Sequence, residues 1–188
     1  MNAWMNLLFA IVLSGCLPMA RCADNNNPKK TMNIQITSTA FSEGQPIPVK
    51  YSCEGRDISP PLQWIPQGGM PPNTKSFALI MDDPDAPVGT WVHWVLYDLP
   101  ANATGLPEDV AKTQVMSNGA KQGLNSWPRL GYGGPCPPPG KPHRYFFKLY
   151  ALDAMLDLKP GLTKKDLLKA MEGHVLAEGQ LMGTYQRK

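Results

Sequence analysis

The chain has 188 residues, 43% of them hydrophobic, and a formal net charge of +3. This length and apolar content fit one globular domain and exclude a chain that is disordered throughout. Lysines and arginines are scattered, with few adjacent pairs such as Lys29-Lys30, so the basic stripe of a nucleic-acid-binding protein is excluded. The 20 prolines and 17 glycines favour many short strands joined by tight turns.

Residues 1–23 are predicted to be a secretory signal peptide, although no Lys or Arg precedes its apolar run. The run from Leu7 to Leu13 is shorter than the roughly 20 residues that span a bilayer. Two cleavage sites compete, and an N-terminal extension that is not cleaved is the third alternative. Leu13-Ser14-Gly15-Cys16 resembles a lipobox, which would leave Cys16 lipidated as a membrane anchor, whereas cleavage after Cys22 would release a soluble protein. The predicted location is periplasmic or secreted, or membrane-anchored as a lipoprotein.

The mature chain is predicted to consist of a linker at residues 24–32 and one domain at residues 33–188. If cleavage follows Cys22, this mature chain keeps Cys53 and Cys136, an even pair in an oxidising compartment. These two residues are candidates for a disulfide, and two separate buried thiols are the alternative.

Most of the domain reads as β-strand. Apolar and polar residues alternate in several segments, while 77–81 is continuously apolar, as in a strand covered on both faces. In 91–97, we expect Trp91, His93, Val95 and Tyr97 to share one face. The predicted strands are 33–38, 47–52, 59–64, 77–81, 91–97, 145–152 and 181–185.

Helices are expected mainly near the C-terminus. Thr163 and Asp166 match a capping box for a helix over 163–171, and Gly173 is a plausible stop. Residues 174–178 could form a second short helix, and residues 108–112 a helical turn within the long irregular connection 99–129. Seven or eight strands with one or two C-terminal helices predict a mainly β fold.

Two separated stretches carry the chemistry. In Met81-Asp82-Asp83-Pro84-Asp85-Ala86-Pro87 an apolar strand ends in three carboxylates held by two prolines, and His93 follows in the next strand. The second stretch runs from Gly131 through Gly133-Gly134-Pro135-Cys136 to His143-Arg144-Tyr145. If the two meet, they form a small pocket.

This pocket predicts an anion site. Two imidazoles and a phenol supply hydrogen-bond donors, and the Gly133-Gly134 loop could offer backbone N–H groups. A carboxylate beside a histidine favours the doubly donating imidazolium form but also repels a fully charged phosphate, so we expect modest affinity.

Other interpretations stay open for the same residues. His93 alone could be a core histidine, the aspartates could be turn formers, and Arg144 could bridge to one of them. Two histidines and a carboxylate could hold zinc, but no His-x-x-x-His or Cys-x-x-Cys pair accompanies them. A hydrolase lacks support, because no Gly-x-Ser-x-Gly is present and Cys136 lies between prolines. We therefore predict no metal, no cofactor and no enzymatic activity.

The two stretches together resemble the signature of the phosphatidylethanolamine-binding protein family, in its bacterial, Raf-kinase-inhibitor-like branch. The motifs are Asp83-Pro84-Asp85-Ala86-Pro87, Trp91-Val92-His93, Gly131-Tyr132-Gly133-Gly134-Pro135-Cys136-Pro137-Pro138 and His143-Arg144-Tyr145, supported by Ser59-Pro60-Pro61-Leu62-Gln63-Trp64 and the ending 176–185. The resemblance covers nearly everything from Met32 onward.

The resemblance implies an antiparallel β-sandwich with a small second sheet, a cis peptide bond before Pro87, and a homodimer. Together with the predicted signal peptide, it also implies an exported binding protein that holds a phosphate-type anion, either a phospholipid head group or a phosphorylated ligand, and regulates a protein partner. The alternatives are an inhibitor of a protease or kinase that acts through its surface loops, or a weak hydrolase. The implied anion-binding residues are Asp83, Pro87, Trp91, His93, Gly134, His143 and Tyr145.

Overall fold

The computed structural model describes residues 1, 32–66 and 68–187, which form a mainly β fold with eight strands and one α-helix. The predicted fold class is confirmed. The elements are β1 (Met32–Thr37), the 3-10 helix η1 (Val49–Tyr51), β2 (Leu62–Pro66), β3 (Ser76–Asp83), β4 (Trp91–Pro100), β5 (Gly105–Leu106), β6 (Lys121–Gln122), β7 (His143–Leu152), α1 (Lys164–Met171) and β8 (Val175–Tyr185).

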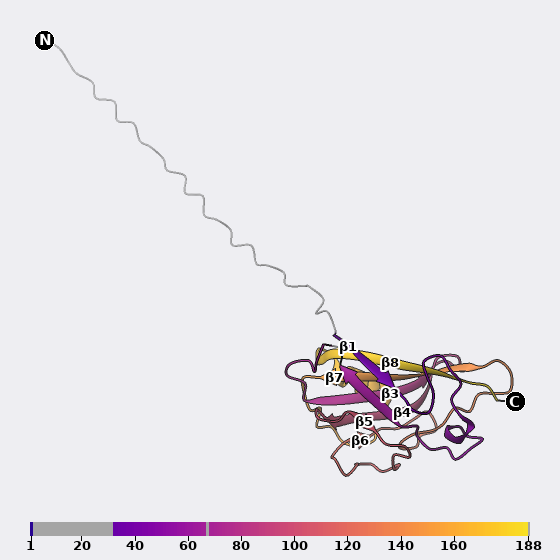
Figure 1. Cartoon of the computed structure of the whole chain (residues 1–188). Helices are drawn as coiled ribbons and strands as arrows, with labels where there is room; N and C mark the ends of the chain where they lie inside the picture. The colour runs from indigo at the N-terminus through magenta and orange to yellow at the C-terminus, as the bar shows by residue number, and fades with distance from the viewer. Residues whose placement is uncertain (2–31, 67, 188) are drawn as a thin grey trace.

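The strands form one curled, mixed sheet in the order β5-β2-β1-β8-β7-β3-β4-β6. β1 runs parallel to β8, and the other neighbouring strands are antiparallel. The smaller part, β5-β2-β1, crosses over the long strands β8, β7, β3 and β4 (Figure 1). The sheet therefore packs partly on itself, as a sandwich does.

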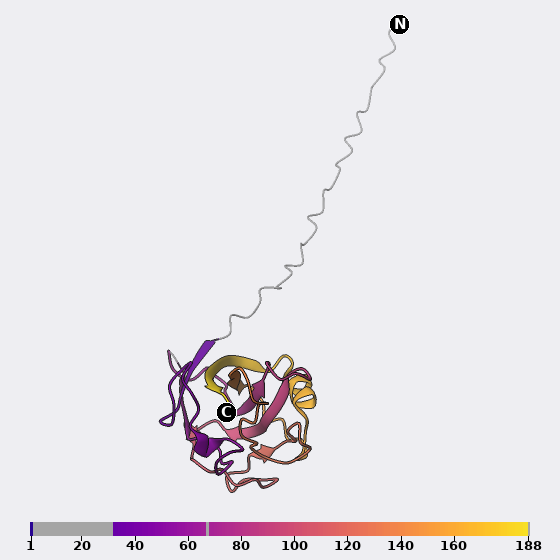
Figure 2. The ribbon, with the colours of Figure 1, turned by 90° about the vertical axis from the view of Figure 1, so that its right-hand side faces the viewer.

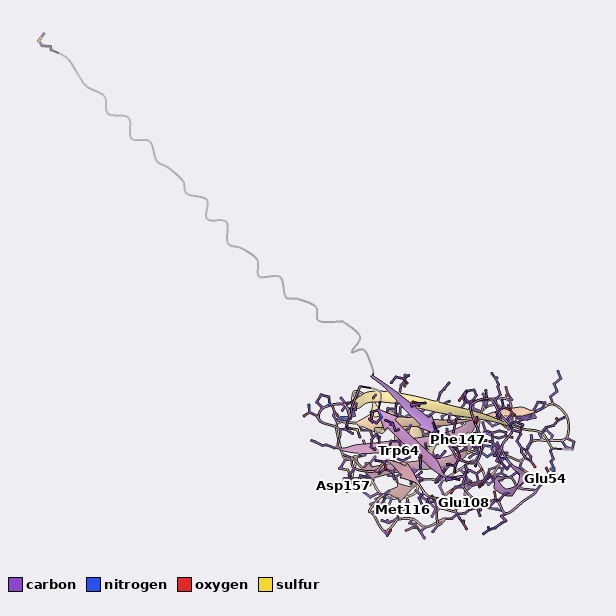
Figure 3. All side chains as sticks on the ribbon, viewed as in Figure 1. Glu54, Trp64, Glu108, Met116, Phe147 and Asp157 are labelled. Atoms are coloured by element: carbon purple, nitrogen blue, oxygen red, sulfur yellow. A yellow bond between two sulfur atoms is a disulfide. The ribbon has the colours of Figure 1, made fainter. Side chains whose placement is uncertain are left out.

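Both faces of the larger part are covered, which explains the continuous apolar run in β3. Ile34, Trp64, Phe77 and Phe147 belong to the main core. Trp64 and Phe147 lie between the smaller and larger parts of the sheet (Figure 3). A second core lies on the opposite face, where the helix α1 lies beside the sheet (Figure 2). Leu167 and Met171 of α1 pack there with residues of β3 and β4. Every residue of β3 is buried.

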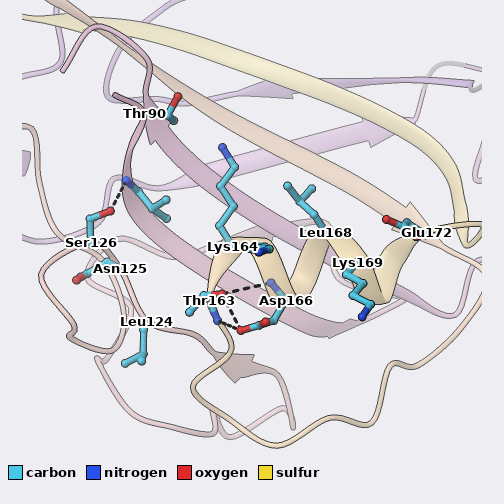
Figure 4. A pocket seen from close by; sticks show the side chains of 12 residues that line it. Thr90, Leu124, Asn125, Ser126, Thr163, Lys164, Asp166, Leu168, Lys169 and Glu172 are labelled. Atoms are coloured by element: carbon cyan, nitrogen blue, oxygen red, sulfur yellow. Dashed lines mark hydrogen bonds between the residues drawn. The ribbon is translucent and has the colours of Figure 1, made fainter. Parts of the chain in front are cut away.

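The helix has the predicted capping box: the Thr163 side chain accepts from the Asp166 N–H, and the Asp166 carboxylate accepts from the Thr163 N–H. Lys164, the first helical residue, reaches the fully buried Asp82 of β3 at 2.5 Å, and Lys148 reaches the same carboxylate at 2.9 Å. An open groove of about 1000 Å³ runs beside α1 (Figure 4). None of the predicted site residues lines this groove.

Three local predictions are wrong. Residues 47–52 contain η1 instead of a strand, because the fixed φ of Pro48 begins a turn that closes from the Tyr51 N–H to the Pro48 carbonyl. Residues 108–112 form no helix. Residues 174–178 are not a second helix, because Gly173, at φ 81°, ends α1 and the chain then pairs with β7 as β8.

Several predictions concern residues outside those described: the signal peptide, lipidation of Cys16, and all of the linker except Met32. Within the described ranges, no helix combines the length and apolar character needed to cross a membrane.

Candidate functional site

A β-bulge in β4 places His93. Met81 of β3 faces Trp94, and the next residue, Asp82, faces Val92, so His93 has no residue opposite it. The extra residue breaks the alternation along the strand. His93 consequently packs on Tyr145 on the main-core side, with ring centroids 5.1 Å apart.

The predicted face of β4 is wrong for the same reason. Val95 and Tyr97 lie on the α1 side together with Val92, whereas Trp94 lies in the main core with Tyr145. A strand with strict alternation would have placed His93 and Val95 on one face. The bulge instead turns His93 toward the end of β3 and the start of β7, where the other predicted residues lie.

A cavity of about 170 Å³ forms at this point. It combines the turn after β3, the start of β4, the loop before β7, and the first residue of β7. Of the predicted residues, Asp83, Pro87, Trp91, His93 and His143 line it. Tyr145 lies next to them through its contact with His93, whereas Gly134 lines a neighbouring cavity.

Asp83 and His143 form a buried pair. The Nδ1 of His143 lies 2.8 Å from Oδ2 of Asp83, and the other carboxylate oxygen accepts from the Asp85 N–H at 2.8 Å. The Asp83 contact takes up Nδ1, so the Nε2 atom of His143 is the one left to meet a ligand.

Asp85 and Arg144 close the outer rim. The guanidinium donates to both carboxylate oxygens, at 2.9 and 2.7 Å, and the Arg144 N–H donates as well. These hydrogen bonds lower the pKa of Asp85 to about 2. Arg144 therefore forms an ion pair with Asp85 at the rim, which is the alternative to ligand binding that the sequence left open for this residue.

The sequence predicts a charged imidazolium beside a carboxylate, but His93 is buried in an environment that favours its uncharged form. Its Nδ1 lies 2.7 Å from the Gly133 carbonyl oxygen, which accepts a hydrogen bond from the Nδ1–H. Burial lowers the pKa of His93 and outweighs the opposing effects of that carbonyl and of Asp83. At neutral pH the ring is therefore uncharged, with Nε2 as its second polar atom.

Two buried donors at the site lack acceptors. The Trp91 Nε1–H and the Tyr145 hydroxyl have no hydrogen-bond partner with good geometry among the residues that the structure describes, although the Tyr145 hydroxyl lies near the Asp83 carboxylate. Burial, followed by the charge of nearby Asp83, raises the pKa of Tyr145, so its hydroxyl stays protonated. Because buried polar groups are nearly always paired, an unpartnered donor on a residue that lines the cavity, with a second one on a residue packed behind His93, indicates a place for an acceptor.

The expectation of free N–H groups in the glycine loop is wrong. The Gly133 N–H donates to the His93 carbonyl at 2.9 Å, and the Gly134 N–H donates to Oδ1 of Asp57 at 2.6 Å. The two glycines serve close packing instead. A Cβ at Gly133 would meet the Trp127 ring at 2.7 Å, and one at Gly134 would meet the Tyr51 carbonyl at 2.3 Å.

The peptide bond before Pro87 is trans, contrary to the expectation. Pro87 follows Ala86 in a turn that the Gly89 N–H closes on the Ala86 carbonyl at 3.1 Å. A trans proline suits this second turn position, whereas a cis proline takes the third.

Cys53 and Cys136 form a disulfide, with Cα atoms 5.4 Å apart. Of the two alternatives left open for this pair, the structure has the bonded one. Cys136 also lines the cavity, so the crosslink ties one cavity wall to the segment after η1.

Trp127 is a wall residue that sequence reasoning missed. Its ring packs edge-on against His93 at 5.1 Å and against Trp91 at 5.3 Å. It lies in the long connection 99–129, where no periodic pattern marks it. The only feature of the sequence that could have indicated a role for Trp127 is its position shortly before the glycine loop. Among the described residues, no group of three or more His, Cys, Asp or Glu side chains could hold a metal ion.

The lowered pKa of His93 predicts a dependence of stability on pH. The unfolded chain takes up a proton at this residue below pH 6.5, while the folded chain does not. The free energy of unfolding should therefore fall as the pH drops below 6.5, with His93 contributing at most about 1.4 kcal/mol per pH unit. Urea unfolding at several pH values should show a shallower slope for His93→Gln than for the wild type. Equal slopes would contradict the prediction.

Comparison with known proteins identifies the family of this chain. The sequence model described as phosphatidylethanolamine-binding protein matches residues 37–186. The chain belongs to the phosphatidylethanolamine-binding protein (PEBP) family. A UPF0098 protein of Methanothermobacter thermautotrophicus is 51% identical over 154 residues, which cover 82% of this chain and 99% of that relative.

Two solved PEBP structures share the fold of this PEBP-family chain. A homologue from Chlamydia trachomatis has 44% identity and a TM-score of 0.74, covering 84% of this chain and all of its own. E. coli YbcL, described as a member of the mammalian PEBP family, has 34% identity and a TM-score of 0.74, covering 83% of this chain and 99% of its own.

Proposed function

We propose that this PEBP-family chain is an exported binding protein that holds a phosphate-type anion in the cavity lined by Asp83, Trp91, His93 and His143. The ligand is a phospholipid head group or another phosphorylated molecule, and binding serves a regulatory role toward a protein partner. The observation that carries the proposal is the pair of orphaned donors, the Trp91 indole N–H and the Tyr145 hydroxyl. A phosphate oxygen is the kind of acceptor that both need.

The charges of the site support modest and reversible binding. Asp83 is the nearest carboxylate, and its oxygens are already occupied by His143 and the Asp85 N–H. An arriving anion favours protonation of the neutral His93 ring at Nε2, and this Nε2–H then becomes an additional donor to the anion. Anion binding is therefore expected to take up a proton at His93 and to strengthen as the pH falls.

Binding without catalysis fits the lining of the cavity. Among the described residues that line it, none is a serine, a threonine or a free cysteine, since Cys136 is in the disulfide. The described lining therefore offers no nucleophile of the serine or cysteine hydrolase kind. Export follows from the N-terminal sequence, and a homodimer and the protein partner follow from the family resemblance.

The proposal predicts that Tyr145→Phe makes the fold more stable but weakens phosphate binding. Removing a buried hydroxyl that has no partner should raise the free energy of unfolding by about 1 kcal/mol. The same change should weaken phosphate binding by about tenfold, because the anion loses a donor. Urea unfolding without phosphate and calorimetric titration with phosphate would measure the two effects on the full chain.

Tyr132→Phe is the matched control. The Tyr132 hydroxyl is also buried but donates to the Tyr51 carbonyl at 2.8 Å, so its removal should destabilise the fold and leave phosphate binding unchanged. His143→Ala should also weaken binding, since His143 lines the cavity. Phosphate affinity that is unaffected by both Tyr145→Phe and His143→Ala would overturn the site.

A further inference from the structure

A second cavity, also of about 170 Å³, adjoins the candidate anion pocket. Trp127 and Cys136 line both cavities, so the two cavities are neighbours. A ligand that occupies both would have to pass these two side chains.

The second cavity has an unpaired positive charge. Lys112 and Asp57 lie in its lining and neutralise each other, with the Lys112 Nζ 3.0 Å from the carboxylate. Arg129 also lines the cavity, and within the described ranges its guanidinium has no ion-pair partner. The described charged groups of the lining therefore sum to one positive charge.

The segment that carries Trp127 and Arg129 is held rigidly. The side-chain oxygen of buried Asn125 accepts from the Trp127 and Arg129 N–H groups, at 3.0 and 3.2 Å, and its amide nitrogen donates to the Gly131 carbonyl at 3.2 Å. The Arg129 carbonyl in turn accepts from the Asn125 N–H at 2.9 Å. Arg129 is thus presented from a fixed backbone, which reduces the entropy lost on binding a charged group.

We propose that this second cavity is a subsite for a second negatively charged group of the same ligand. The inference rests on the proposed function, because the first anion is the one held by His93 and His143. It narrows the ligand class to a phosphate ester whose other end is a carboxylate or another phosphate. A ligand that ends in an ammonium group is disfavoured, because that group would meet Arg129.

Matched pairs of small phosphate esters test this subsite on the full chain. Carboxyethyl phosphate and aminoethyl phosphate share the phosphate and the linker and differ in the charge of the far end. Carboxybutyl phosphate and aminobutyl phosphate form a second pair with a longer linker between the phosphate and the charged end. In at least one pair, at low salt, the carboxylate should bind about tenfold more tightly than the amine. The Trp91 and Trp127 indole N–H resonances report where each probe binds.

Charge reversal at Arg129 provides the decisive comparison. Arg129→Glu should invert the preference within the pair while inorganic phosphate still shifts the Trp91 resonance. Lys75→Glu makes the same change in net charge at the far end of β3 from Asp83, and it should leave the preference nearly intact.

The two failures can be told apart. If inorganic phosphate binds at Trp91 but no pair shows a preference, or if Arg129→Glu leaves it unchanged, the subsite is wrong and the first pocket stands. If neither phosphate nor any ester shifts the Trp91 resonance, the proposed function fails, and the subsite fails with it.

Discussion

Replacing Cys53 and Cys136 together by alanine should lower the free energy of unfolding by about 4 kcal/mol. The disulfide joins residues 83 positions apart, so it removes a large amount of conformational freedom from the unfolded chain. The loss should appear in urea unfolding of the oxidised wild type and the double variant. Wild type treated with a reductant should approach the stability of the variant.

The crosslink should also matter for binding, because Cys136 lines both cavities. The double variant should bind phosphate more weakly than the wild type under conditions where both are folded, since Pro137 and Pro138 of the wall lose their attachment to the segment after η1. A stability change below about 1 kcal/mol would mean that the disulfide contributes far less than loop closure predicts.

Replacing Lys148 and Lys164 together by methionine should destabilise the fold by about 3–5 kcal/mol. Asp82 is fully buried, and the two ammonium groups are its ion-pair partners among the described residues. Methionine keeps the aliphatic length of each side chain but leaves a buried carboxylate without a counter-charge. Thermal and urea unfolding of the double variant measure the effect.

Adding Asp82→Asn to that variant is the control. The amide carries no charge, so the triple variant should recover most of the lost stability even though it lacks all three original groups. If the triple variant is no more stable than the double one, the loss comes from disturbed packing around α1 and not from the isolated charge.

Elements with a strong local signal could be predicted from the sequence. The helix was predicted because Thr163 and Asp166 are the right distance apart for a capping box, which depends on backbone groups within one turn. The strand β3 was predicted because a strand that is buried on both faces appears in the sequence as a continuous run of apolar residues. The helix predicted at 174–178 was wrong because these residues pair with β7, which lies more than twenty residues earlier in the chain.

The candidate site was predicted in part. The family, the mainly β class, and the proximity of Asp83, His93 and His143 could be predicted from the sequence, because ordered motifs of this kind specify a shared fold. It could not determine the bulge at His93, since a bulge arises from the pairing of two strands and leaves no periodic trace in either one.

The polar groups that are available to a ligand became known only from the folded chain. Gly133 and Gly134 carry N–H groups in any conformation, but whether those groups are free depends on the distant partners His93 and Asp57. The orphaned donors of Trp91 and Tyr145 and the unpaired charge of Arg129 are likewise properties of the assembled fold. Hydrogen bonds and ion pairs join residues far apart in the chain, so folding alone determines which donors and charges remain for binding.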